Sequence, residues 1–250
     1  NYATALRTEK KFTPVQNYVD GEKLLYLNEK EFAQTLLSAF DTEEFKDHSD
    51  FCRVLAWTNK RVAQWNQRIR HAIFGNEAPQ FVSGERLIAT GACTRSLEGK
   101  KSIFGDKLPE IVLLPTSGEI YVLEAEEQSE VIEYASMKGE IFQYWEISAI
   151  DEENNEKMFR VLADSEKQRY QAMLQDFYQR KNWEEYWGLK RAFDPLQYAY
   201  ALTVHRSQGS TFQQVFLDLR NLLANYKSQE RKQLLYTAAT RASERLVVLG

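Results

Sequence analysis

The sequence predicts an α/β fold, in which a lobe with a parallel sheet is interrupted by a β-rich insert. Short, mostly apolar runs at 52–57, 199–204, 215–217 and 246–249 are typical of buried parallel strands. Helical periodicity follows the first run and separates the last two. Between about 81 and 162 the pattern changes to short alternating runs divided by turns. We therefore expect the lobe to comprise residues 1–80 and 164–250, and the insert to comprise 81–163.

The helices of the lobe carry recognisable start signals. Asn28 is followed three residues later by Glu31, which predicts a capped helix through about Phe40. Thr58 can cap the next helix. Apolar residues repeat along that helix at helical spacing: Val62, Trp65, Ile69 and Ile73.

The insert contains turn signals between strand-like runs. Ser117-Gly118 predicts a hairpin that joins 111–114 to 120–123. Further strands are expected at 131–134, 141–150 and 159–162, followed by helical pattern through 178 and again through 183–187. The acidic runs 124–127 and 151–153 are typical of solvated turns. Trp183, Tyr186 and Trp187 are expected in the core rather than on a base-stacking surface.

Composition limits the function classes. The 250 residues, 43% hydrophobic and 13% aromatic, can build a sizeable core, and no run approaches the length of a membrane span. Residues 1–11 contain no apolar signal-peptide core. Cys52 and Cys93 are too few for a disulfide scaffold, so a reduced, cytoplasmic setting is expected, and no metal-ligand spacing is present. The net charge of −4 argues against a nucleic-acid partner that covers the surface, but not against a local grip on phosphates.

Two segments carry chemistry. In the first, 202–212, an apolar strand runs into a polar loop that crowds a His, an Arg, hydroxyls and an amide around Gly209, whose backbone can approach a phosphate. In the second, 234–242, an apolar helix ends in Thr240-Arg241. The Arg241 guanidinium is a fork of donors well matched to a phosphate.

These segments resemble conserved motifs of superfamily 1 DNA helicases. The segment around His205 looks like motif V, that around Arg241 like motif VI, and 53–66 like motif IV, in the family's order. The insert resembles the SH3-like barrel of the RecD-like and Dda-type branch. The resemblance implies the second RecA-like lobe of a motor, with an inserted SH3-like β barrel.

The resemblance also implies roles by position. Arg241 would be the arginine finger on the γ-phosphate of ATP, which a first lobe would bind together with Mg²⁺. The nucleotide cleft would be lined by Gln208, Gly209, Tyr236 and Thr240. Single-stranded DNA would meet Thr58, Asn59, Thr203, His205 and Ser207.

The sequence departs from the family pattern at several places. Trp57 stands where some members carry a phosphate-binding Arg, and Thr211 where many carry an acid. The nearest imitation of a phosphate loop, 99–102, lacks its first glycine, and an exposed loop is the simpler interpretation of Lys100 and Lys101. The run 147–152 imitates a Walker B strand but lies in the β-rich insert. With no Walker A loop, this chain alone is expected to be inactive.

The sequence therefore favours the C-terminal motor half of an ATP-dependent DNA helicase that translocates on single strands, 5′-to-3′ if the branch holds. The partners would be single-stranded DNA and an N-terminal RecA-like lobe, with a single-strand-binding protein or a nuclease as further candidates. Two alternatives stay open: a non-catalytic adaptor whose β insert docks a protein, and a RecD-like subunit of an exonuclease complex.

Overall fold

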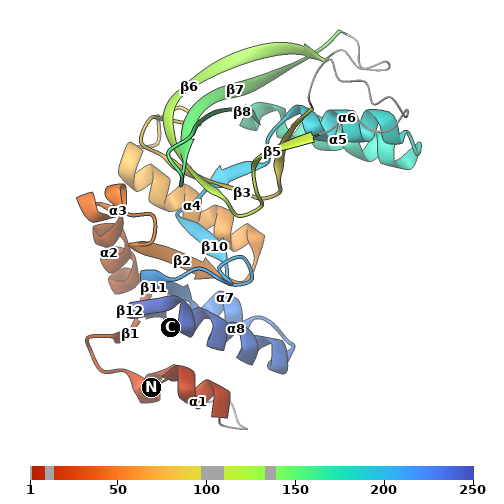
Figure 1. Ribbon diagram of the computed structural model, residues 1–250. Helices are drawn as coiled ribbons and strands as arrows, with labels where there is room; N and C mark the ends of the chain where they lie inside the picture. Colours follow the sequence, from red (N-terminus) through yellow and green to blue (C-terminus); the bar gives the residue numbers. More distant parts are fainter. Residues whose placement is uncertain (1, 9–13, 97–109, 133–138) are drawn as a thin grey trace. The chain divides into compact units, whose positions relative to one another are not determined.

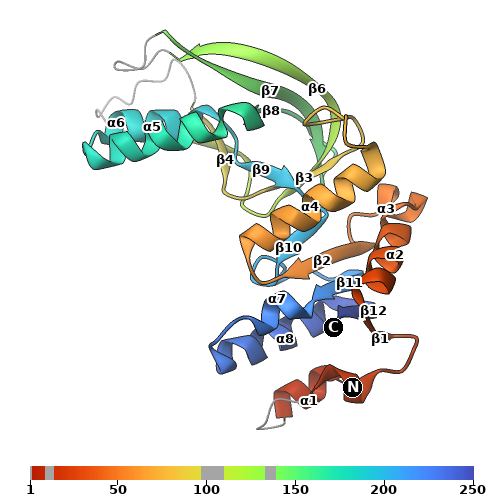
Figure 2. The same ribbon diagram turned by 180° about the vertical axis from the view of Figure 1, so that it is seen from behind.

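The computed structural model describes residues 2–8, 14–96, 110–132 and 139–250 (Figure 1, and from behind in Figure 2). The chain forms two compact units. The first joins residues 1–77 to 199–250, and the second comprises 78–198. The second unit thus enters the sequence of the first as an insertion.

The first unit is built on a five-stranded sheet in which every pair is parallel, in the order β1-β12-β11-β2-β10. The strands are β1 (Leu24–Leu27), β2 (Cys52–Ala56), β10 (Ala201–Thr203), β11 (Phe212–Asp218) and β12 (Ala242–Leu249). The helices are α1 (Tyr2–Thr8), α2 (Glu29–Phe40), α3 (Glu43–Asp47), α4 (Asn59–Phe74), α7 (Leu219–Leu223) and α8 (Ser228–Arg241), with a 3-10 turn at Val15–Tyr18. The prediction of an α/β fold with a parallel sheet is confirmed.

The expected helix starts are present. The Asn28 side chain accepts hydrogen bonds from the backbone N–H groups of Lys30 and Glu31, and the Glu31 carboxylate accepts from the Asn28 N–H, which completes a capping box at α2. The Thr58 hydroxyl accepts from the Arg61 N–H at the start of α4. Local pairing within a few residues decided both starts, which is why the sequence predicted them.

The core of the first unit is aromatic where α2 and α4 meet the sheet. Phe32 of α2 packs against Trp65 of α4 and Phe216 of β11, with ring centroids 5.6 and 5.7 Å apart. All three side chains are buried. Arg53 is also fully buried within β2; its guanidinium donates to the carbonyls of Ala199 and Ser49. The cation therefore ties the start of β10 to β2.

The second unit is antiparallel. Its main sheet has the order β8-β7-β6-β3-β9, and a separate pair is formed by β4 and β5. The strands are β3 (Arg86–Ala89), β4 (Cys93–Ser96), β5 (Glu110–Leu114), β6 (Glu119–Ile132), β7 (Glu140–Asp151), β8 (Glu156–Leu162) and β9 (Leu196–Tyr198). The helices are α5 (Lys167–Gln179) and α6 (Trp183–Ala192), after a 3-10 turn at Asp164–Glu166. Among the described strands no pairing closes a barrel, so the SH3-like form stays a prediction.

The predicted hairpin at Ser117-Gly118 is wrong. The turn exists, with the Gly118 N–H bonded to the Pro115 carbonyl, but it joins strands of different sheets. Strand β5 pairs with β4, whereas β6 pairs with β3 and β7. Backbone bonds between the turn and Ala89 of β3 hold it in place. The local pattern predicted that β5 pairs with β6, but each strand pairs with a different strand, and these partners are not visible in a short stretch of sequence.

The predicted acidic turn at 124–127 is also wrong, since these residues lie inside β6. They pair with β7, where Ala125 is opposite Ile147 and Glu127 is opposite Trp145. Their glutamates are exposed, as expected for solvated charges. Exposure alone did not distinguish the outer face of a strand from a turn.

Helices α5 and α6 belong to the second unit, although the expected boundary put residues 164–198 with the lobe. They pack on strands β7 and β8 through a cluster that includes Phe142, Leu162, Phe177 and Leu189. The expected core placement of the tryptophans is wrong: Trp183 and Trp187 are 47% and 48% exposed. The buried residues of α6 are Glu185, Gly188 and Leu189.

Candidate nucleotide and nucleic-acid surfaces

The candidate DNA residues gather at the carboxyl edge of the parallel sheet. Thr58 and Asn59 follow the end of β2, and His205 follows the end of the neighbouring strand β10. The Val204 N–H donates to the carbonyl of Ala56 at 2.9 Å, so the two strand ends remain paired beyond the sheet (Figure 1). Loops at the carboxyl ends of parallel strands are where α/β sheets bind ligands.

A side-chain network fixes the start of α4. The Asn221 side-chain carbonyl accepts hydrogen bonds from the N–H groups of Trp57 and Thr58, at 2.8 and 3.0 Å. The Asn221 amide group donates to the Thr58 hydroxyl at 3.3 Å. Asn59 is exposed at the first position of the helix. The Thr58 hydroxyl is therefore engaged within the lobe, and Asn59 is the more accessible of the two candidates.

Of the three candidate DNA residues in and beside the loop that follows β10, His205 is the exposed one. Its side chain is 58% exposed, and its Nε2 lies 3.8 Å from the Glu230 carboxylate of α8. Thr203 and Ser207 are buried. The Thr203 hydroxyl accepts from the Arg206 N–H, and the Ser207 hydroxyl donates to the Val204 carbonyl. In this conformation Thr203 and Ser207 shape the loop, and His205 is the side chain that it presents.

The candidate nucleotide residues lie at the opposite, amino edge of the sheet. Gly209 has φ +97°, a conformation that favours glycine, and a Cβ there would meet nothing within 4 Å. Arg241 ends α8 just before β12. Its Nη1 donates to the Ser210 carbonyl at 2.7 Å and its Nε to the Thr237 carbonyl at 3.3 Å. The loop with Gln208 and Gly209 and the end of α8 are thus brought together.

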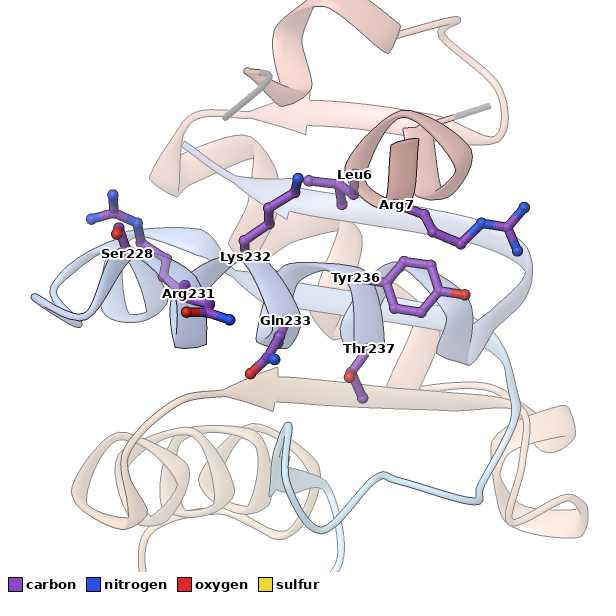
Figure 3. Close-up of a pocket in the computed structure, with 9 residues that line it drawn as sticks. Leu6, Arg7, Ser228, Arg231, Lys232, Gln233, Tyr236 and Thr237 are labelled. Atoms are coloured by element: carbon purple, nitrogen blue, oxygen red, sulfur yellow. The ribbon is translucent and has the colours of Figure 1, made fainter. Parts of the chain in front are cut away.

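A pocket of about 740 Å³ opens beside this arginine, between α1 and α8 (Figure 3). Tyr236 and Thr237 contribute to its lining, and Thr237 also supplies the carbonyl that receives Arg241. The remaining lining residues are mostly basic or amide-bearing: Leu6, Arg7, Ser228, Gln229, Arg231, Lys232 and Gln233. Thr240 lies outside this lining; its hydroxyl donates to the Thr237 carbonyl and accepts from Arg241.

Sequence reasoning missed Arg7, Arg231 and Lys232. Arg7 is near the N-terminus in an ordinary polar run, and only the packing of α1 on α8 brings it to the pocket. Arg231 and Lys232 of α8 stand in the sequence just before the segment 234–242 that resembles motif VI. A search for cations on the helical face shared with Tyr236 could have found them.

The imitations of phosphate motifs fall outside the candidate surfaces. Residues 99–102 lie outside the described part of the chain. The run 147–152 ends strand β7 and begins the turn to β8, as expected of the acidic run 151–153. The Asp151 carboxylate accepts from Lys157 and from backbone N–H groups, and these bonds lower its pKa to about 2. It is a turn-closing side chain.

The cysteines are free and buried, and burial raises the pKa of each thiol to about 12. Both are therefore protonated near neutral pH. No group of three or more His, Cys, Asp or Glu side chains that could hold a metal ion occurs among the described residues. Within the same residues, no helix is long and apolar enough to cross a membrane.

Residues 198–249 match the UvrD-like helicase C-terminal domain. The matched region contains the loop after β10 and all of α8. The chain is also 26% identical over 205 residues to the ATP-dependent DNA helicase dda of Enterobacteria phage T4, covering 76% of this chain and 45% of that protein. An uncharacterised protein of Acanthamoeba polyphaga mimivirus is 33% identical over 105 residues, covering 36% of this chain and 21% of that protein. The chain spans less than half the length of these relatives.

The similar solved structures include Pif1 helicases. That of Candida albicans has 14% identity and a TM-score of 0.38, over 89% of this chain and 53% of that one. That of Bacteroides, in complex with ADP-AlF3 and ssDNA, has 13% identity and a TM-score of 0.35, over 99% of this chain and 48% of that one. With TM-scores this low, the interpretation rests on the sequence matches. Those matches relate residues 198–249 to the UvrD-like helicase C-terminal domain and a longer stretch of the chain to the phage helicase.

Proposed function

We propose that this chain is the second motor half of an ATP-dependent DNA helicase that moves along single-stranded DNA and unwinds duplex. ATP and Mg²⁺ would be held mainly by a first RecA-like lobe, and this lobe would add the arginine finger and part of the strand-binding groove. The movement would be 5′-to-3′, as expected of the RecD-like and Dda-type branch. This half alone would be inactive.

One observation carries the proposal. A single loop, 204–211, leaves the carboxyl end of β10 and enters the amino end of β11. The loop exposes His205 at the carboxyl edge of the sheet. At the amino edge, its Ser210 carbonyl accepts a hydrogen bond from Arg241. A change at either surface can therefore reach the other through one short segment, which suits a motor that couples hydrolysis to strand movement.

The residues of the amino edge fit a nucleotide phosphate. The Arg241 guanidinium is planar and permanently charged, so it can stabilise the charge that develops on the γ-phosphoryl oxygens. The neighbouring pocket adds Arg7 and the aromatic ring of Tyr236. Reaching a phosphate would exchange the contact with Ser210 for one with the nucleotide. Gln208 and Gly209 are exposed and precede Ser210, so they would move when Arg241 leaves the Ser210 carbonyl.

The test is Arg241→Ala in the full-length protein. Fingers of this kind contribute on the order of 10³ to 10⁵ in turnover, and we expect kcat to fall by at least about a hundredfold. Nucleotide affinity should fall much less, since most ground-state contacts would come from the other lobe. Arg241→Lys should recover little, because an ammonium cannot form two parallel bonds. ATPase rate, nucleotide Kd and melting temperature are measured together.

If Arg241 is an ordinary surface side chain, Arg241→Ala should leave the ATPase rate unchanged. Near-parental turnover in Arg241→Ala, with an unchanged melting temperature, would reject the finger and most of the motor proposal with it.

A protein-binding or adaptor role is the second candidate, and one observation favours it. Tyr178, Trp183 and Trp187 of α5 and α6 are each about half exposed or more, and rings of this cluster contact one another. Exposed aromatic patches often mark partner surfaces. A full-length protein without ATPase or strand affinity, which lost a protein partner on Trp183→Ser and Trp187→Ser substitution, would favour this role over the motor.

A further inference from the structure

We propose that Tyr226 is a base-stacking platform for single-stranded nucleic acid at the carboxyl edge of the sheet. The inference rests on the proposed function and extends it. It names a residue outside the helicase motifs, and assigns its ligand as the face of an unpaired base. The observations are the exposure of the ring, the rigidity of its turn and its neighbours.

The Tyr226 ring is far more exposed than is usual for an aromatic side chain. It is 84% exposed, the largest value among the exposed large hydrophobic side chains of the described residues. Large aromatic rings bury area wherever they can, so a ring held in solvent needs a reason. Every base has a π face, and stacking on an exposed ring requires no particular sequence.

The turn that carries Tyr226 is held on both sides. Asn225 is 1% exposed, and its N–H donates to the carbonyl of Leu222. The Asn225 side-chain carbonyl accepts from the Lys227 N–H at 3.0 Å, and its main-chain carbonyl accepts from Arg231 at 3.3 Å. Because its flanking residues are pinned, the backbone that carries the ring is held in place. Binding to such a platform loses little conformational entropy.

The neighbours of the turn connect it to the candidate DNA loop. Lys227 Nζ lies 5.9 Å from the Tyr226 ring centroid and 3.9 Å from the Glu230 carboxylate. The same carboxylate lies 3.8 Å from His205 Nε2. A strand whose phosphates meet His205 and Lys227 would therefore pass close to the ring. Aromatic stacking beside a cationic track is the usual design of single-strand sites.

The experiment compares Tyr226→Ala with Tyr226→Phe in the full-length protein. The probes are oligo(dT) and an oligonucleotide of the same length with abasic sites, which keeps the phosphates but has no faces to stack. We expect Tyr226→Ala to weaken oligo(dT) binding by about five- to a hundredfold, and Tyr226→Phe to bind like the parent. Leu223→Ala, which truncates an exposed side chain without a ring on the preceding helix, is the matched control and should bind normally.

Two further readouts separate stacking from charge. The abasic probe should bind the parent and Tyr226→Ala equally, because the lost interaction needs a base. The slope of log Kd against log salt should not change, because no phosphate contact is removed. Unchanged oligo(dT) affinity in Tyr226→Ala, or an equal loss on the abasic probe, would overturn the inference.

Failure of the inference and failure of the proposed function look different. If His205→Ala weakens oligo(dT) binding and Tyr226→Ala does not, the stacking platform is rejected and the motor stands. If the parent protein binds neither oligonucleotide, the proposed function is rejected together with this inference. A protein partner whose affinity depends on Tyr226, with oligo(dT) binding unaffected, also rejects it.

Discussion

Two aspartates each end a strand, one in each unit, and they hold their surroundings in different ways. Asp218 ends β11 in the first unit and is fully buried. Its carboxylate accepts from Arg61 Nε at 2.5 Å, from Trp65 Nε1 at 2.8 Å and from the Asn221 N–H at 3.0 Å. The partners lie on α4 and α7, up to 157 positions away in the sequence.

Asp151 ends β7 in the second unit, and its carboxylate bonds within the hairpin of β7 and β8. Its carboxylate accepts from Lys157 Nζ at 2.5 Å and from the N–H groups of Glu153 and Asn155, each at 2.9 Å. These partners lie within six positions of it. Asp151 therefore closes a turn, whereas Asp218 joins three elements at the edge that presents the candidate DNA residues. The partners of Asp151 are near it in the sequence and can be predicted from a short window, whereas those of Asp218 are brought together only by the fold.

The largest effect is expected when the buried carboxylate is neutralised. In Asp218→Asn one side-chain oxygen becomes an NH₂ group that faces the donors of Arg61, Trp65 or Asn221, so at least one buried hydrogen bond is lost. Charge-assisted bonds of this kind contribute about 1.5–3 kcal/mol, and we expect a loss of roughly 2–3 kcal/mol in the free energy of unfolding. Denaturant unfolding of the full-length protein measures it. A loss below about 0.5 kcal/mol would mean that water replaces the network without cost.

The second prediction concerns Asn221, whose replacement should cost less unfolding free energy than that of Asp218 but should lower the affinity for DNA. Asn221→Ala removes the acceptor of the Trp57 and Thr58 N–H groups and should cost about 1–2 kcal/mol. Because the start of α4 loses its anchor, the affinity for single-stranded DNA should fall more than kcat does. Asn221→Asp keeps the acceptor and should recover part of the affinity. Titration with oligo(dT) and ATPase assays at saturating DNA separate the two quantities.

A structural role alone predicts another pattern for Asn221. If Asn221→Ala lowers the melting temperature but leaves oligo(dT) affinity at the parental value, the network stabilises the fold without positioning a binding edge.

The same contrast explains what the sequence predicted. Signals whose partners lie a few residues apart were correct: the Asn28–Glu31 capping box, the Thr58 cap and the turn at Asp151. The parallel lobe also followed from buried apolar runs. The resemblance implied that the candidate loop and the helix end serve one nucleotide; the bond between Arg241 and Ser210 joins the two segments, and their roles stay predictions.

What the sequence missed depends on distant partners. Nothing local marks the Asn221 side chain, since its hydrogen-bond partners, Trp57 and Thr58, lie more than 160 positions away. The turn at Ser117-Gly118 was assigned to a hairpin because its pairing with Ala89 is invisible in a short window. Trp183 and Trp187 were assigned to the core from residue type, although α6 buries Glu185, Gly188 and Leu189 instead. Arg7 reaches the pocket only through the packing of α1 on α8.

The smallest effect is expected at Asp151, and it appears only in acid. The bond from Lys157, then those from backbone N–H groups, lower the pKa of this carboxyl from an ordinary 3.8 to about 2. A carboxyl with a lowered folded pKa stabilises the fold above its unfolded pKa, and the contribution is lost as the pH falls from about 4 towards 2. Carbon-13 NMR of the Asp151 carboxyl should therefore show a titration midpoint near 2, well below the ordinary 3.8. Lys157→Met removes the main cause and should move the midpoint back towards the ordinary value, whereas Asn221→Ala, in the other unit, should not move it. If Asp151 titrates normally in the parent, the hairpin is not closed by this carboxylate, and the contrast with Asp218 loses its local half.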